Sequence, residues 1–188
     1  EPGPLRIVFL SRISPMKNLD FLLRVVKSVR ISVSVDIYGL RDDLEYWKRI
    51  QLLMDNLPSH ISVHYHGEVS PEKVSSIFLR YDLFVFPTLG ENFGHVILES
   101  LTAGTPVLLS DRTLWRDSGD GGLHVLPLEK PEAWIAAIEE WGAVDANGLQ
   151  TRRKAARNYA LRYRSDSGAI QANREMFSGV VDSLGGAS

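Results

Sequence analysis

Two carboxylates, Glu91 and Glu99, stand with seven residues between them around a glycine, Gly94. The apolar run before them, 83–86, is typical of a buried strand, and residues 93–103 are typical of a helix. We therefore expect Glu91 in the loop at the carboxyl end of a strand, and Glu99 inside the following helix. Open α/β sheets bind their ligands at this end of their strands.

The glycine turn between the two carboxylates suits an anion. Gly94 lets the backbone approach a ligand closely, because glycine has no Cβ. The amides of about Phe93 to Val96 open the helix, and the N-terminus of a helix attracts anions such as phosphate. Glu99, about a turn and a half into the helix, could accept hydrogen bonds from two vicinal hydroxyls, as a ribose offers. Glu91 could reach the hydroxyls of a sugar.

The alternative is that Glu91 caps the helix and Glu99 is an ordinary exposed residue. Val96, Ile97 and Leu98 make the helix apolar on much of its circumference, so we expect Glu99 to be partly buried. A buried carboxylate needs a partner, which favours a binding role. An acid–base couple is not favoured, because no water-activating partner is evident. We interpret the pair as two contacts on one ligand, with phosphates between them.

Two cations, Arg12 and Lys17, lie five residues apart after the apolar run 5–10. Arg can bind phosphate oxygens bidentately, and Lys adds a point charge. Together they suit a diphosphate, provided that the loop curls toward the crevice of the sheet. The alternative is a solvated loop with ordinary surface charges.

Two further glycines, Gly39 and Gly67, end apolar runs. At Gly67 the main chain could approach a flat ring, and backbone groups near Glu68 and Val69 could read the edge of a base. Each signal is weak alone, since many strands end in glycine.

Several other chemistries are disfavoured. The chain has no cysteine, which excludes disulfides, thiolate catalysis and Cys-based zinc sites. It has no Gly-x-Gly-x-x-Gly after the first strand, no P-loop and no Asp-x-Asp. His64 and His66 share one face of a strand, but nothing nearby in the sequence completes a metal site, so no metal is expected. Trp115 lies in a loop beside the same crevice, where ligand contact and simple packing are both open.

The bulk composition is that of an ordinary globular domain. The 188 residues carry a net charge of −2, which gives no basic field for nucleic acid. No apolar run approaches the ~20 residues that would span a bilayer.

Apolar runs alternate with helical patterns along the chain, and this rhythm predicts an α/β fold. Strands are predicted at 5–10, 33–38, 61–65, 83–86, 107–109 and 123–125. Helices are predicted at about 19–30, 43–57, 71–79, 93–103 and 131–141, and two more near 148–163 and 165–184. The result is a Rossmann-like, doubly wound parallel sheet of about six strands with extra C-terminal helices.

Boundary signals complete this organisation. Asn18 and Ser70 are plausible helix caps, and Gly104 fits a C-terminal cap. Residues 5–184 are expected to form a single domain, with a tag or linker remnant at 1–4 and a disordered tail at 185–188. The abrupt start without Met indicates an excised fragment.

These segments, in this order, resemble the C-terminal domain of the group-1 retaining glycosyltransferases of GT-B fold. That family carries an Arg…Lys pair after the first strand, a Glu-x₇-Glu across a glycine turn, and a small-Gly-x-Pro-Val strand start. The matching residues are Arg12 and Lys17, Glu91 and Glu99, and 103–107. The match covers about 5–141, and residues 90–95 and 110–117 look like a bacterial surface-polysaccharide branch.

The resemblance implies a role for each matching residue. Arg12, Lys17 and Glu91 would be catalytic: the two cations would stabilise the leaving nucleoside diphosphate without a metal, and Glu91 would bind the donor sugar. Glu99 would bind the ribose hydroxyls. The implied donor-binding residues are Gly39, Glu68, Val69, Asn92, Phe93, Gly94, His95 and Glu99. Main chain at Val69 would hold the base, and amides at 93–95 would face sugar and phosphate.

Three departures from the family pattern fall in the donor loops. The usual glycine before the Arg is Ser11, and the usual glycine after the Lys is Asn18. The second glycine of Gly-x-Gly after the second strand is missing, since Leu40 and Arg41 follow Gly39.

We interpret the chain as the donor-binding half, 5–184, of a retaining glycosyltransferase that moves a sugar from a UDP- or GDP-sugar to an acceptor hydroxyl. The acceptor-binding N-terminal half is absent from this chain, so we expect the fragment to bind nucleotide without transferring sugar. The alternatives are another GT-B enzyme, such as a nucleotide-sugar epimerase or a phosphorylase, a non-catalytic nucleotide-sugar binding module, and a flavodoxin-like domain without sugar chemistry.

The expected partners are the nucleotide sugar, which is a substrate and not a cofactor, and the missing half of the enzyme. No nucleic acid is expected. The full-length enzyme is expected in the cytoplasm, and contact with the inner face of the membrane would run only through the missing half.

Overall fold

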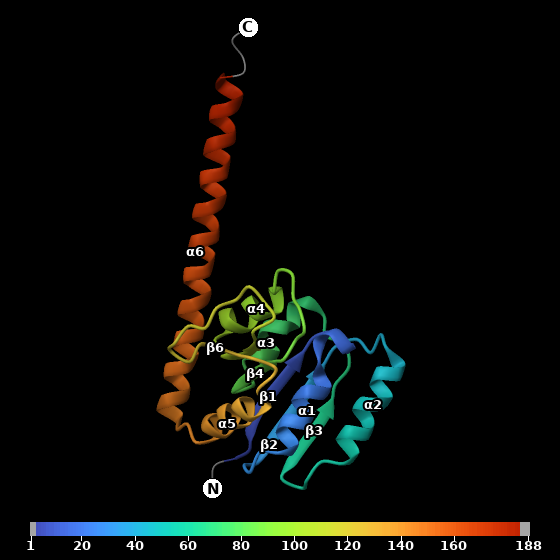
Figure 1. The fold of residues 1–188 in the computed structure, drawn as a ribbon. Coiled ribbons are helices and arrows are strands. Elements are labelled where there is room, and N and C mark those ends of the chain that lie inside the picture. Colours follow the sequence, from blue (N-terminus) through green and yellow to red (C-terminus); the bar gives the residue numbers. More distant parts are fainter. Residues whose placement is uncertain (1–2, 185–188) are drawn as a thin grey trace.

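Six parallel strands form one sheet in a computed structural model of the chain (Figure 1). The structure describes residues 3–184, with side chains as far as residue 168. Residues 1, 2 and 185–188, expected to belong to a remnant and a tail, lie outside the described residues. The strand order is β3-β2-β1-β4-β5-β6, so the winding reverses between β1 and β4.

All six strands were predicted from the sequence to within one residue at each end. They are β1 Leu5–Leu10, β2 Val33–Tyr38, β3 Ile61–Tyr65, β4 Leu83–Phe86, β5 Val107–Ser110 and β6 Leu123–Leu126. Every residue of β4 and β5 is buried. Strands covered on both faces read as unbroken apolar runs, which is why composition alone located them.

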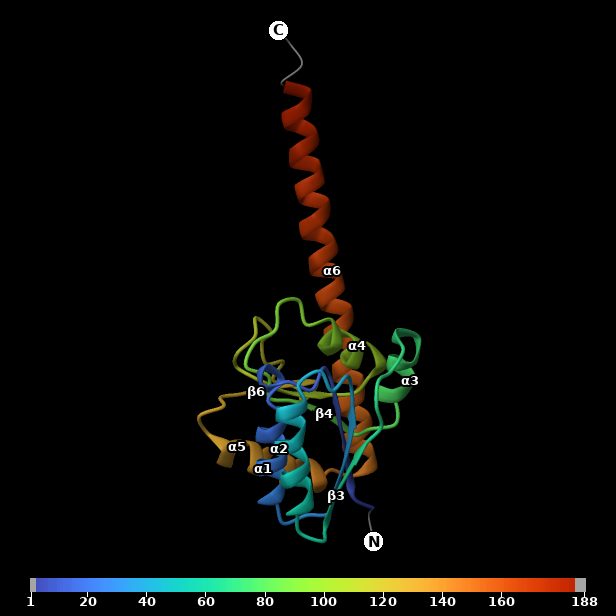
Figure 2. The ribbon, with the colours of Figure 1, turned by 90° about the vertical axis from the view of Figure 1, so that its right-hand side faces the viewer.

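Helices cover both faces of the sheet (Figures 1 and 2). On one face α1 contacts α2 and α5, and on the other α4 contacts α3 and α6. Their bounds are α1 Leu19–Lys27, α2 Leu44–Asp55, α3 Val74–Phe78, α4 His95–Ala103, α5 Pro131–Gly142 and α6 Ala146–Leu184, with short 3-10 turns at Pro15–Lys17 and Pro71–Lys73. This is the predicted doubly wound α/β fold. Within residues 3–184, none of the helices has the combination of length and apolar character that crossing a bilayer requires.

Helix α6 corrects the prediction of two C-terminal helices, since it is continuous and extends well beyond the sheet (Figure 1). The predicted break lay between residues 163 and 165, just before a polar stretch. However, the Ser165 hydroxyl donates to the Leu161 carbonyl at 3.0 Å and Ser167 to Tyr163 at 2.8 Å, which satisfies these hydroxyls inside the helix. The sequence of the last helix also predicts an apolar surface along residues such as Met176, Phe177 and Val180, and these lie outside the described side chains.

The cap predictions have mixed outcomes. Gly104 ends α4 in the left-handed conformation, with φ 85°, as expected. Asn18 precedes α1, but its side chain makes no capping bond. Its side-chain Nδ2 instead donates to the Pro87 carbonyl at 2.9 Å. Ser70 likewise makes no side-chain cap. Asp43 caps α2 by accepting from the Tyr46 amide at 2.8 Å.

Gly39 allows the loops after β1 and β2 to touch. Its φ is 145°, and a Cβ there would lie 1.7 Å from the Ser11 carbonyl oxygen. The Gly39 amide also donates to the Gly67 carbonyl at 2.8 Å, which ties the loop after β3 to the same point. A side chain at position 39 would therefore separate loops that the sheet holds together.

Gly39→Ala is expected to lower the free energy of unfolding by about 3 kcal/mol or more, because the new Cβ would overlap backbone. Urea denaturation measures the loss. Gly67→Ala is the matched control: its φ of 87° is also positive, but no atom lies within 4 Å of the added Cβ. It should cost only about 1–2 kcal/mol of backbone strain. Equal losses in the two variants would contradict the role of the Ser11 contact.

Candidate donor site at the carboxyl edge of the sheet

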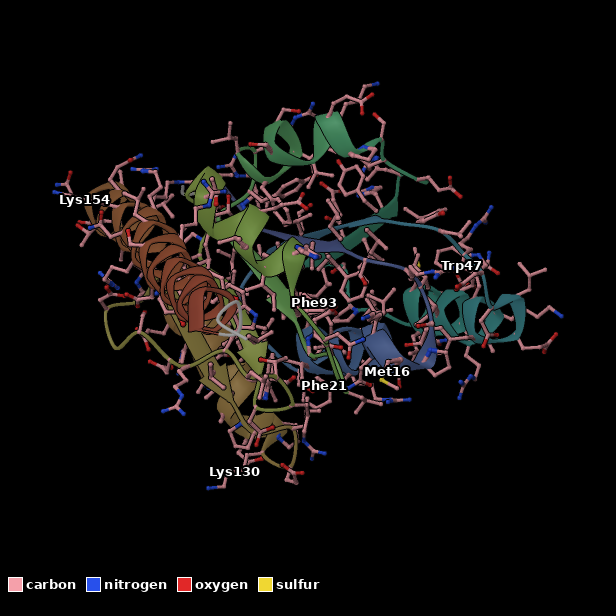
Figure 3. All side chains as sticks on the ribbon, turned by 90° about the horizontal axis from the view of Figure 1, so that it is seen from above. Met16, Phe21, Trp47, Phe93, Lys130 and Lys154 are labelled. Atoms are coloured by element: carbon pink, nitrogen blue, oxygen red, sulfur yellow. The ribbon has the colours of Figure 1, made fainter. Side chains whose placement is uncertain are left out.

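The loops that follow β1 and β4 meet at the carboxyl edge, where the sheet reverses its winding. The Leu89 amide donates to the Met16 carbonyl at 2.8 Å, and Asn18 donates to Pro87. Figure 3 looks down on this edge, with Met16 and Phe93 labelled on the two loops. Adjacent parallel strands end side by side, so loops separated by some seventy residues in sequence form one surface.

Lys17 and Glu91 form an ion pair across these loops. Lys17 Nζ lies 2.6 Å from Glu91 Oε2, and the side chains are only 18% and 19% exposed. The same ammonium lies 5.8 Å from the centre of the Phe86 ring. The sequence suggested separate roles for these two residues, and the structure brings them into direct contact.

Arg12 has a different partner, which the sequence did not indicate. Its Nε lies 3.0 Å from Asp42 Oδ2, in the loop after β2, and its side chain is 65% exposed. An exposed pair of this kind contributes roughly 0–1 kcal/mol. A ligand could therefore displace Asp42 at small cost.

A cavity of about 310 Å³ joins four of the predicted residues, Arg12, Gly39, Glu68 and Val69. They come from the loops after β1, β2 and β3, and Leu10, Ser11, Tyr38 and Leu40 complete the lining. The Ile13 amide donates to the Leu40 carbonyl at 2.9 Å, which holds the first two loops together. The cavity lining combines one cation, Arg12, and one carboxylate, Glu68, with mostly apolar side chains, which suits a flat ring whose anionic part faces Arg12.

Gly94 forms the turn before α4 in the left-handed conformation, with φ 65° and ψ 40°. Its carbonyl accepts from the amides of Ile97 at 3.0 Å and Leu98 at 3.1 Å. Among the described residues, the amides of His95 and Val96 have no acceptor, as expected for a first helical turn. These N–H groups are available to an anion. Asn92, Phe93 and His95 are exposed around the turn, and Phe93 is 75% exposed.

Glu99 corrects one expectation, since it is exposed and not partly buried. Val96, Ile97 and Leu98 turn their apolar atoms toward the body of the protein, which leaves Glu99 on the open side of α4. Nearby atoms still exclude enough water to raise the pKa of its carboxyl, while the charge of His95 acts to lower that pKa. The carboxylate therefore lies at the rim of the edge without an ionic partner among the described residues.

The three departures from the family pattern are compatible with the loop shapes. Asn18 has a φ of 62°, the left-handed conformation that glycine would adopt and that Asn tolerates. Ser11 contributes only its carbonyl to the contact with Gly39. Arg41 turns away from the cavity and stacks over Tyr65, 4.9 Å from the ring centre, and over Trp47.

The His64 and His66 pair has a partner that sequence spacing did not show. Asp36 of β2 lies in register with His64, and its Oδ1 is 2.8 Å from His66 Nε2. Its other oxygen accepts from the Tyr81 hydroxyl at 2.8 Å. Among the side chains that the structure describes, no cluster of three His, Cys, Asp or Glu residues could hold a metal ion.

Comparison with protein families gives a match over most of the chain. Residues 1–159 match the model of the family described as glycosyl transferases group 1. A D-inositol 3-phosphate glycosyltransferase from Streptomyces griseus is 32% identical over 162 residues, which are 79% of this chain and 34% of the relative. Its counterpart from Rhodococcus erythropolis is 27% identical over 74% of this chain and 34% of its own length. The chain thus spans 34% of the length of these curated relatives.

Solved structures share the fold at low identity. Anabaena HepE in complex with UDP-glucose superposes with a TM-score of 0.75 at 18% identity, over 94% of this chain and 49% of HepE. The catalytic domain of a cholesterol-α-glucosyltransferase from Helicobacter pylori gives a TM-score of 0.67 at 20% identity, over 85% of this chain and 100% of that domain.

The Lys17–Glu91 pair is expected to be energetically coupled. Its shielded geometry should give a coupling of at least about 1 kcal/mol in a double-mutant cycle of Lys17→Met and Glu91→Gln. The matched control is Lys48–Glu45, at 2.9 Å but 67% and 84% exposed. That pair should couple by no more than about 0.5 kcal/mol. Both coupling energies are measured by urea denaturation. Equal values for the two pairs would show that shielding from water does not strengthen the Lys17–Glu91 pair.

Glu99→Gln is expected to stabilise the protein at neutral pH. A raised pKa means that the folded state disfavours the charged carboxylate, so Glu99 lowers stability above its folded pKa. This penalty disappears below the ordinary pKa of 4.5, where both states are protonated. Urea denaturation should show a gain at pH 7 that is absent at about pH 3.5. Glu72→Gln, on an exposed turn, is the control, and a gain in Glu99→Gln that persists in acid would contradict the linkage.

Proposed function

The chain belongs to the group 1 glycosyl transferases, and from that premise we propose that it is the donor-binding half of a retaining glycosyltransferase. The observation that carries the proposal is the shared edge: the cavity at Arg12, the Lys17–Glu91 pair and the Gly94 turn all lie where parallel strands end. A nucleotide sugar has three chemically distinct parts, and this edge offers a matching group for each.

The base and ribose occupy one end of the proposed site. The cavity around Gly39 and Val69 takes the base, with main chain at the loop after β3 facing its edge. Glu99 accepts hydrogen bonds from the ribose hydroxyls. The raised pKa of Glu99 supports this role, because a carboxylate that is partly shielded from water benefits from new donors.

The diphosphate lies between Arg12, Lys17 and the open amides of α4. Its charge offers Lys17 a second anionic partner beside Glu91. Arg12 exchanges Asp42 for phosphate oxygens, which it can bind bidentately. These groups need little reorganisation, since Lys17 and the Gly94 turn are already held in place by their contacts.

The sugar lies next to Glu91. One carboxylate oxygen remains with Lys17, and the other is free to accept from a sugar hydroxyl. During transfer, the bond between the anomeric carbon and the diphosphate oxygen breaks and a bond to the acceptor oxygen forms, with the anomeric configuration kept. The acceptor proton passes to the departing diphosphate. Arg12, Lys17 and the helix amides stabilise the charge that builds on that leaving group without a metal.

The acceptor-binding half lies outside this chain in this proposal. The short coverage of the relatives, 34% of their length, supports a second unit in the complete enzyme. The chain alone then binds a nucleotide sugar but does not transfer the sugar. HepE was solved with UDP-glucose, so UDP-glucose is the first donor to test, followed by GDP-sugars. We further place the enzyme in the cytoplasm and in bacterial surface-polysaccharide synthesis.

Ligand-observed NMR with UDP, GDP, ADP and their sugars tests the proposal. One nucleoside diphosphate should bind. Arg12→Ala and Lys17→Ala should each lower its affinity about tenfold or more, since a hydrogen bond to a charged group contributes about 1.5–3 kcal/mol.

Arg24→Ala is the matched control for Arg12. Arg24 is 61% exposed and paired with Asp20 at 2.6 Å, so it resembles Arg12 in exposure and pairing but lies on α1. Its substitution should leave binding unchanged. Absence of binding to every nucleotide, or equal loss in Arg24→Ala and Arg12→Ala, would overturn the proposal.

A further inference from the structure

The Gly94 turn rests on the indole of Trp115. A Cβ at position 94 would lie 2.4 Å from Trp115 Nε1 and 3.2 Å from its Cε2, and 3.0 Å from the Ile97 side chain. The indole therefore occupies the space that a side chain at position 94 would need. Trp115 comes from the loop after β5, so a third loop of the carboxyl edge supports the turn from beneath.

Trp115 is itself held by helix α6. It is 8% exposed, and its ring stacks on Tyr163 at 4.4 Å and on Tyr159 at 5.9 Å between ring centres. The Tyr159 hydroxyl donates to the Arg116 carbonyl at 3.0 Å, which fixes the next residue of the same loop. A continuous series of contacts thus runs from α6 through the indole to Gly94.

The outer side of the turn has no comparable support. Phe93 is 75% exposed, and His95 is exposed beside it with the two rings 5.7 Å apart. The indole and the Ile97 side chain are therefore the groups nearest to Gly94, and only the indole comes from another loop. Because the Gly94 carbonyl accepts from Ile97 and Leu98, the position of Gly94 sets the direction of the first amides of α4.

We propose that Trp115 is a positioning residue for the donor site: it holds the Gly94 turn so that the amides of α4 point at the diphosphate. The inference rests on the proposed function of that turn. Trp115 does not touch the nucleotide, and it acts through Gly94. Tyr163 and Tyr159 of α6 pack against Trp115 in turn. The position of α6 therefore affects the position of the Gly94 turn.

This role predicts an effect on one end of the ligand only. The cavity proposed for the base is lined by the loops after β1, β2 and β3, and Trp115 contributes nothing to it. Loss of the indole should therefore weaken contacts to phosphate and sugar while contacts to the base remain. A general loss of structure would weaken both.

Trp115→Ala, Trp115→Phe and Tyr163→Ala test this division, with the affinities of UDP and uridine, or of GDP and guanosine, measured by ligand-observed NMR. In Trp115→Ala the diphosphate should bind about tenfold more weakly while the nucleoside binds as before, since one hydrogen bond to a charged group contributes a factor of about ten or more in affinity. Trp115→Phe keeps a ring against Tyr163 and should recover much of the affinity. Tyr163 is 38% exposed, so its removal spares the core and should give a smaller loss in the same direction.

Trp141→Ala is the matched control for removal of a buried indole. Trp141 is 5% exposed on α5, with Arg152 4.2 Å above its ring, and none of its atoms is among those nearest to Gly94. It should change diphosphate and nucleoside affinities by the same factor or not at all. Equal factors for diphosphate and nucleoside in the Trp115 variants would overturn the inference, as would unchanged diphosphate binding in Trp115→Ala.

A measurement without ligand separates this inference from the proposed function. The Trp115→Phe and Tyr163→Ala variants should shift the backbone amide resonances of Gly94, His95 and Val96, while those of Gly39 and Val69 stay in place. If the original chain binds no nucleotide, the proposed function fails, and these resonances still decide whether Trp115 positions the turn. Unmoved resonances at 94–96 would refute that role.

Discussion

The adjacency of β1 and β4 is the constraint on which the rest of the structure depends. Parallel strands that neighbour each other end at the same edge, so the reversal of winding between them brings the Arg12–Asn18 loop to the Thr88–Gly94 loop. The Lys17–Glu91 ion pair and the bond from Leu89 to Met16 exist only because of this placement. Gly39 extends the same edge to β2, since its missing Cβ leaves room for the Ser11 carbonyl.

Four charges of the edge form two ion pairs before any ligand binds, and the two pairs differ in kind. Lys17 and Glu91 are shielded and close, so their geometry is already determined. Arg12 and Asp42 are exposed, so their pairing is weak and readily exchanged. A site built in this way combines a rigid centre with an adaptable cation at its entrance, which suits a ligand that must enter, react and leave. We propose that this ligand is a nucleotide sugar, which must bind, react and then leave as a nucleoside diphosphate.

Much of the fold was predictable, for reasons that particular residues illustrate. Strands such as 83–86 are buried on both faces, so their composition is an unbroken apolar signal. The family match over residues 1–159 confirms the resemblance drawn from Arg12, Lys17 and the Glu91–Glu99 spacing. Other features were missed for different reasons. The polar residues near 165 suggested a break in α6, yet local hydroxyl bonds satisfy them, and Glu99 is exposed because its apolar neighbours take the inner side of α4. The failure of Asn18 as a cap was not predictable, because it depends on a neighbour far away in sequence. Asn18 bonds to Pro87 instead of its own helix, and that contact has no local signature.

By itself, the sequence determined the strands and the glycine positions, because burial and backbone conformation act through local composition. It also supplied the residues that we propose for diphosphate binding. Only the tertiary structure decided which of those residues meet. It paired Lys17 with Glu91 and Arg12 with Asp42, gathered Gly39, Glu68 and Val69 around one cavity, and set Trp115 under Gly94. Contacts between distant segments depend on sheet order and on the directions of side chains. Neither can be inferred from the spacing of residues along a single chain.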